Sequence, residues 1–133
     1  MKKINITSSV SLLALLATLA ATRAKANVGV AVDTVHQTIE HLVGPQPAAQ
    51  LQKLAVDALI RRGSRKGNIL SSRSGQNGWH AVCYGYRGNS SRLVSVGFGA
   101  AGTKEEARRA AKTNAQSYGG NRFVIVWETY DAS

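Results

Sequence analysis

The histidines and the single cysteine have the greatest scope for catalysis or metal binding. His36 and His41 are five residues apart, so on a helix they would not share a face as an i, i+4 metal pair does. His80 and Cys83 are three apart in a segment that alternates like a strand, so their side chains point to opposite faces. No H-E-x-x-H, C-x-x-C or G-x-S-x-G motif and no pair of spaced carboxylates accompanies them. The sequence therefore predicts no catalysis, no metal and no cofactor.

Gly97-Phe-Gly-Ala-Ala-Gly102 matches the G-x-G-x-x-G pattern of dinucleotide-binding loops. It follows an expected strand and precedes an expected helix, which is the context that such a loop requires. Glu105 and Glu106 would place negative charge in the first turn of that helix, where a pyrophosphate would have to bind. We therefore expect these glycines to permit a bend and close packing of the helix.

Two groups of side chains are candidate binding sites. The first is the densest basic stretch after residue 26, formed by Arg61, Arg62, Arg65, Lys66 and Arg73. It could contact an acidic partner, or it could only keep a linker solvated. The second is an exposed sheet face that would present aromatic anchors to a partner, formed by Trp79, Tyr84 and Tyr86.

The pattern of apolar residues over 27–62 predicts two helices. Apolar residues recur at helical spacing at Val28, Val32, Val35, Ile39 and Leu42. The alternation of Val28, Val30 and Val32 would instead fit a strand at the start. Gly44-Pro-Gln-Pro47 ends this element, and a second helix is expected from about Ala48 to Arg62. The sequence thus predicts a helical hairpin over 27–62 and a flexible Gly/Ser-rich basic linker over 63–78.

Residues 79–133 predict a β-β-α-β unit. Strands are expected at Trp79–Arg87, Arg92–Gly99 and Phe123–Trp127, with turn residues between the first two. A capping box from Thr103 to Glu106 should start a helix with an alanine-rich face. The predicted fold class is α+β: an N-terminal helical hairpin, then a small antiparallel sheet in β-β-α-β order with one helix packed on it. No internal repeat is visible.

Residues 78–130 resemble a bacterial exported family catalogued as domain of unknown function 4189. The similar segments are Trp79-His-Ala-Val82, Val94-Ser-Val-Gly-Phe-Gly99, Thr103-Lys-Glu-Glu-Ala107 and Val124-Ile-Val-Trp127. Members commonly carry cysteines where this chain has Ser117 and Phe123. The resemblance implies export and no known activity.

A second resemblance is to the double-stranded-RNA-binding domain. Thr103-Lys-Glu-Glu-Ala-Arg108 is similar to the helix start with which that domain grips phosphates. Leu51–Arg62 would then stand as its first helix and Ile69–Ser74 as its first strand. Glu105 occupies the place of a phosphate-binding lysine, where charge neutralisation is the basis of binding.

Residues 1–26 have the pattern of a cleavable signal peptide. Lys2 and Lys3 precede an apolar run from Val10 to Ala21, and Ala24-Lys-Ala26 offers a cleavage site. The sequence therefore predicts export to the periplasm or the medium, with a mature chain that starts at Asn27. Four of the 17 basic residues precede the cleavage site, which leaves 13 against 7 acidic residues and a net charge of +6.

These observations favour a small exported binding protein without catalytic activity, of the inhibitor, immunity or effector type. The expected partner is an acidic protein, a cell-envelope polymer or another anionic surface. The alternative is a nucleic-acid binder of the double-stranded-RNA type. Cys83 cannot form a disulfide within the chain. It is expected to be a buried thiol, the alternative being a bridge between the two chains of a homodimer.

Overall fold

The computed structural model describes residues 27–131, so the predicted signal peptide lies outside the described residues. Six strands and two helices follow one another in the described part of the chain, with a short 3-10 turn at Lys66–Asn68. In chain order they are β1 (Asn27–Asp33), β2 (Thr38–Gly44), α2 (Ala48–Arg61), β3 (Ile69–Ser74), β4 (Gly78–Tyr86), β5 (Leu93–Ala101), α3 (Lys104–Gln116) and β6 (Arg122–Asp131).

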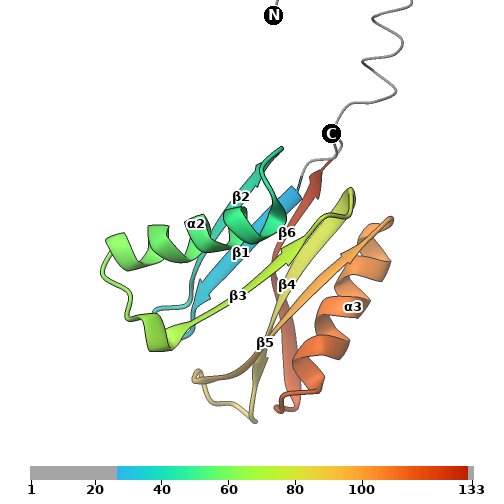
Figure 1. Cartoon of the computed structure of the whole chain (residues 1–133). Helices are drawn as coiled ribbons and strands as arrows, with labels where there is room; N and C mark the ends of the chain where they lie inside the picture. Colours follow the sequence, from blue (N-terminus) through green and yellow to red (C-terminus); the bar gives the residue numbers. More distant parts are fainter. Residues whose placement is uncertain (1–26, 132–133) are drawn as a thin grey trace, which may run out of the picture.

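The strands form two antiparallel sheets of three strands that pack face to face. The strand orders are β2-β1-β3 and β5-β4-β6, so β1 and β4 are the central strands. The inward side chains form one core, whose buried members are Val28, Val30, Val32, Val82, Tyr84 and Val96. The outward side chains of β1 pack on α2, and those of β4 pack on α3. The result is four layers, with one helix on each outer face (Figure 1).

The predicted N-terminal helical hairpin is wrong, because residues 27–44 form the hairpin of β1 and β2. Its register runs from Asn27 opposite Gly44 to Asp33 opposite Thr38. The alternation of Val28, Val30 and Val32 was the relevant signal, since these side chains all enter the core. Val35, which completed the helical spacing, lies in the turn and is 62% exposed. The many β-branched residues here also favour strand over helix.

The predicted linker over 63–78 is also corrected, because it contains β3. This strand pairs antiparallel with β1 from Ile69 opposite Asp33 to Ser74 opposite Val28. Ile69–Ser74 is the strand expected from the resemblance to the double-stranded-RNA-binding domain. Here, however, it pairs with β1 and not with β4, which lies in the other sheet.

The two halves of the described chain share one topology. Each half consists of two strands, a helix and a third strand, and in each half the first strand is the middle of its sheet. The expected β-β-α-β order from residue 79 onward is thus present, but as one of two such units. The predicted single sheet under one helix is therefore replaced by two stacked sheets with a helix on each.

Two glycines of β5 allow α3 to lie directly on the sheet. A Cβ atom at Gly97 would collide with the backbone of Ala111 and Ala115, and one at Gly99 with the backbone of Ala107 and Ala111. The expectation that the glycines of this segment permit close helix packing is confirmed for Gly97 and Gly99 but not for Gly102, whose added Cβ atom would meet nothing within 4 Å. At the start of α3 the Thr103 hydroxyl accepts a hydrogen bond from the Glu106 N–H at 3.2 Å, as the capping box predicts.

Candidate binding groove between the two sheets

The stack of sheets has two long edges, and one of them is closed by rings. The His41 ring of β2 and the Trp127 ring of β6 lie 4.8 Å apart, centroid to centroid. β2 and β6 are edge strands of different sheets. The two rings therefore meet across the space between the sheets at this edge.

The opposite edge, between β3 and β5, is open and hollowed. Three adjoining cavities of about 160, 560 and 220 Å³ open there, and the first reaches inward between the sheets as far as Trp127 of β6. The first and second share Ser72 and Phe98, and the second and third share Leu70 and Val94. Together they form a continuous hollow along both strands, which we name the β3–β5 groove.

The strand register explains why one edge is closed and the other open. His41 and Ser72 both lie opposite Val30 of β1, while Phe98 and Trp127 both lie opposite Val82 of β4. When the two halves are matched by their shared topology, His41 corresponds to Phe98 and Trp127 corresponds to Ser72. A serine thus stands at the open edge where the closed edge has an indole.

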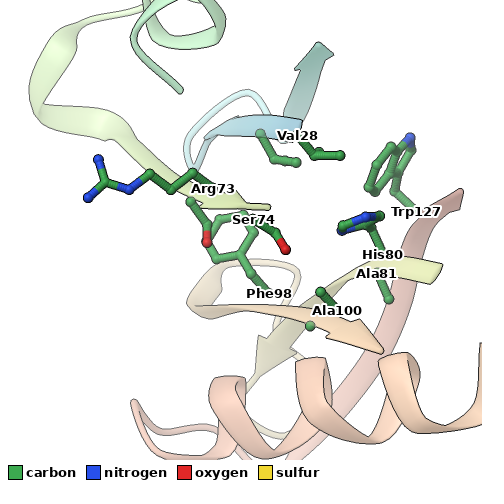
Figure 2. A pocket seen from close by; sticks show the side chains of 11 residues that line it. Val28, Arg73, Ser74, His80, Ala81, Phe98, Ala100 and Trp127 are labelled. Carbon is green, nitrogen blue, oxygen red and sulfur yellow. The ribbon is translucent and has the colours of Figure 1, made fainter. Parts of the chain in front are cut away.

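The lining of the β3–β5 groove mixes apolar side chains with serine, histidine and amide groups. Figure 2 shows its inner end, where Val28, Phe98 and Trp127 lie around Ser74 and the buried His80. At its outer part Leu70, Val94 and Tyr118 remain 47%, 38% and 69% exposed. A hollow that combines apolar surface with polar groups is a candidate ligand site.

The rim of the groove is positively charged. Arg73 is a residue of β3 and lines the groove, and its guanidinium extends away from His80 and Trp127 (Figure 2). Lys66 precedes Gly67, and Arg92 precedes Leu93, both of which line the third cavity. Residues 58–104 contain no acidic residue and eight basic ones: Arg61, Arg62, Arg65, Lys66, Arg73, Arg87, Arg92 and Lys104. The charges near the groove are therefore all of one sign over this part of the chain.

The predicted basic patch is divided by the structure. Arg65, Lys66 and Arg73 are exposed and lie in or beside β3. Arg62 pairs with Glu40 of β2 at 2.6 Å, and Arg61 lies at the end of α2. Three of the five residues therefore belong to the groove region, and the other two belong to α2 and its contact with β2.

The predicted aromatic face does not form. Tyr84 is 3% exposed between the sheets, and Tyr86 packs against the same core. Trp79 lies on the α3 side instead, with its ring 5.2 Å from the Tyr130 ring and 5.2 Å from the Lys104 Nζ. The reason is strand alternation, since residues five apart point to opposite faces. Burial raises the pKa of Tyr84 to about 12, with Tyr86 and Asp33 adding to the shift.

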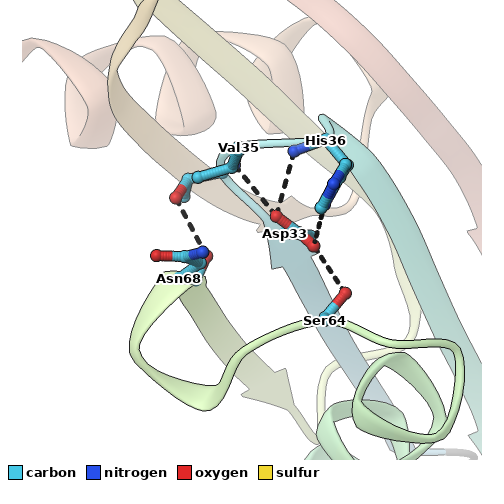
Figure 3. Close-up of polar contacts among 6 residues, drawn as sticks. Asp33, Val35, His36, Ser64 and Asn68 are labelled. Atoms are coloured by element: carbon cyan, nitrogen blue, oxygen red, sulfur yellow. Dashed lines mark hydrogen bonds and ion pairs between the residues drawn. The ribbon is translucent and has the colours of Figure 1, made fainter.

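A cluster of Asp33, His36 and Ser64 looks like catalytic machinery but serves the turn between β1 and β2 (Figure 3). The Asp33 carboxylate is buried and accepts the Ser64 hydroxyl at 2.5 Å, the His36 Nδ1 at 2.8 Å and the backbone N–H groups of Val35 and His36. Both side chains bind its Oδ2 atom, so the carboxylate lies between the hydroxyl and the imidazole. A nucleophile needs its base directly beside it, so this order fits a structural role.

The Asp33 carboxylate is strongly held in its charged form. Burial acts to raise its pKa, but the hydrogen bonds from Ser64, His36 and Val35 outweigh this and bring the pKa well below its ordinary value. The neighbouring Thr34 donates from its N–H and its hydroxyl to the Asn68 carbonyl at 2.8 and 2.9 Å. The turn is thereby fixed to the start of β3.

Sequence reasoning missed most of the groove residues, among them Leu70, Ser72, Val94, Phe98 and Trp127. Their place depends on the stacking of two sheets, which the fold prediction did not include. The signal that was available is the acid-free interval over 58–104, since it covers both strands of the groove.

Within residues 27–131, no group of three or more His, Cys, Asp and Glu side chains could hold a metal ion. No helix among the same residues is long and apolar enough to cross a membrane. Cys83 is a free, buried thiol, and its burial raises its pKa. No family model, no curated protein and no solved structure matches the chain.

Proposed function

We propose that this chain is a small exported binding protein without catalytic activity, and that it binds an anionic partner in the β3–β5 groove. The observation that carries the proposal is the contrast between the two edges of the sandwich. One edge is bridged by the contact between the His41 and Trp127 rings, whereas the other is hollow, lined by both apolar and polar side chains, and basic at its rim.

The two kinds of groove residue have separate roles in this proposal. Burial of the exposed Leu70, Val94 and Tyr118 side chains supplies affinity, because apolar surface leaves water. The basic rim supplies attraction and orientation, because charge complementarity speeds encounter and excludes partners of the wrong sign. A binding role also fits the use of Asp33, His36 and Ser64 to hold a turn.

The binding test compares two variants that remove the same charge. Lys66→Gln with Arg92→Gln removes two positive charges from the groove rim, and Arg109→Gln with Lys112→Gln removes two from exposed positions on α3 that do not line the groove. With a labelled polyglutamate probe, the rim variant should bind about three- to tenfold more weakly than the wild type, and the control should bind nearly as the wild type. Binding of the wild type should weaken as salt rises, because exposed charges are screened over about 8 Å at physiological ionic strength. Equal losses in both variants would show a general charge effect and contradict the assignment of the groove.

Export is tested independently of binding. Intact-mass measurement of the protein in the exported fraction should give a chain that starts at Asn27, because Ala24 and Ala26 fill the small-residue cleavage positions. A dominant species that starts at Met1 and stays in the cell would reject export and leave the groove proposal standing.

A further inference from the structure

The outer edge of β3 is an open strand edge beside the groove. β3 pairs with β1 on one side, and no strand of the part of the chain that the structure describes lies on its other side. An edge strand presents alternate N–H and C=O groups to a partner, and proteins often block such edges with proline, bulges or charges. β3 has no proline, its register with β1 is unbroken, and Arg73 is its one charged residue. This edge can therefore accept another strand.

The facing edge of β5 is partly covered. The side-chain oxygen of Asn114 accepts a hydrogen bond from the Phe98 N–H at 2.9 Å. Since β5 pairs with β4 on its other side, the Asn114 amide covers an outward backbone group of β5. The edge of β3 is thus the better position for a partner strand, and β5 with α3 forms the far wall.

The faces of β3 define the side chains that an added strand would carry. Ser71 faces α2, where its Oγ accepts a hydrogen bond from the Gln52 side chain at 2.8 Å. Leu70 and Ser72 alternate with it and line the groove. A strand added beside β3 continues its sheet, so every second side chain would enter the groove against Val94 and Phe98. These positions favour apolar residues.

The remaining side chains of the added strand would meet a basic surface. Arg65, Lys66 and Arg73 lie in or beside β3, and no acidic residue occurs over 58–104. Aspartate or glutamate is therefore favoured at the positions between the apolar ones. A second copy of this chain would bring the same basic residues together across the edge, and like charges disfavour that pairing.

We propose that the partner is an acidic polypeptide segment that binds in extended conformation. Its backbone pairs with the free edge of β3, and its alternate apolar side chains fill the β3–β5 groove. This inference rests on the proposed function, because it names the partner class of the same groove.

The test uses pools of synthetic peptides of about eight residues, a common strand length. The first pool has glutamate at every second position and valine, leucine or phenylalanine between. A second pool has the same sequences with every backbone amide N-methylated, and a third has lysine in place of glutamate. Affinity for the purified protein is measured by fluorescence anisotropy, and hydrogen exchange is measured across the chain.

The first pool should bind, and the N-methylated pool should bind at least about tenfold more weakly because it cannot donate backbone hydrogen bonds. The lysine pool should give no saturable binding. In the complex with the first pool, amides of Ile69–Ser74 should exchange more slowly than in the free protein.

Three results would overturn the inference. Equal affinity of the N-methylated pool would reject strand pairing and keep the groove as the binding site. Binding of polyglutamate or of a short RNA duplex, with no binding of the first pool, would reject the extended apolar–acidic partner and keep an anionic ligand. If the first pool, polyglutamate and the RNA duplex all failed to bind, both this inference and the proposed function would be wrong.

Discussion

At the scale of single residues, Asp33 is the polar side chain with the most structural consequence. It accepts hydrogen bonds from Ser64, from His36 and from two backbone N–H groups while fully buried. Asp33→Ala should lower the free energy of unfolding by about 2–4 kcal/mol, because these donors lose their acceptor in a buried site. Chemical denaturation measures this loss. His36→Ala is the control and should cost much less, since its side chain is 66% exposed.

The Asp33 carboxylate should also make the free energy of unfolding depend on pH. Because the pKa of Asp33 is lower in the folded chain than in the unfolded one, the charged form stabilises the fold fully above about pH 4. This contribution should be lost progressively as the pH falls below that value toward the folded-state pKa. Between pH 6 and about pH 2, the melting temperature should therefore fall less steeply for Asp33→Asn than for the wild type. Parallel curves would show that Asp33 does not carry the effect.

The reactivity of Cys83 tests whether its side chain is buried as the structure shows. Its side chain is fully buried on β4 under α3, so the folded chain does not present it to another molecule. A thiol reagent should modify it only slowly in native buffer and quickly in denaturant, because burial also raises the pKa of the thiol. Fast native modification, or a covalent dimer under oxidising conditions, would contradict this placement.

At the scale of elements, the contact of α3 with β5 makes a sharp prediction. Gly97→Ala should destabilise the protein by about 3 kcal/mol, because the new methyl group would collide with the backbone of Ala111 and Ala115. Gly102→Ala is the matched control and should change stability by less than about 0.5 kcal/mol, because no atom lies within 4 Å of its added Cβ. Equal melting temperatures for the two variants would mean that α3 does not lie on β5 at this distance.

The elements also show which parts of the fold were readable from the sequence. α2, β4, β5 and α3 were predictable because apolar spacing, Gly and Pro stops and a capping box agree there. β1 and β2 were misread because Val28, Val32 and Val35 satisfy a helical period by coincidence, while Val35 lies in the turn. β3 was misread because Ser71, Ser72 and Ser74 are typical of loops, and its pairing with β1 is a contact between distant parts of the chain.

At the scale of the whole molecule, the groove results from an imperfect repeat. The two halves share a topology, and the corresponding residues Trp127 and Ser72 differ greatly in size. Periodicity within one strand cannot reveal this difference, because it depends on which strands of the two sheets face one another. The charge of the site was partly predictable, since Arg65, Lys66 and Arg73 were singled out. The hollow between β3 and β5 was not predictable from local pattern alone.

Polyglutamate binding by a variant that closes the groove tests whether the β3–β5 groove is the binding site. Ser72→Trp places an indole where the other edge of the sandwich has Trp127, and Thr38→Trp adds the same group to an exposed position on β2. Val94→Glu is a second groove variant, which adds a negative charge at a partly exposed position and needs no burial of a large ring.

With all three variants folded, as judged by cooperative melts, Ser72→Trp and Val94→Glu should each weaken binding by about tenfold or more. Thr38→Trp should bind like the wild type. Wild-type affinity in both groove variants would contradict the claim that the hollow between β3 and β5 is the binding site.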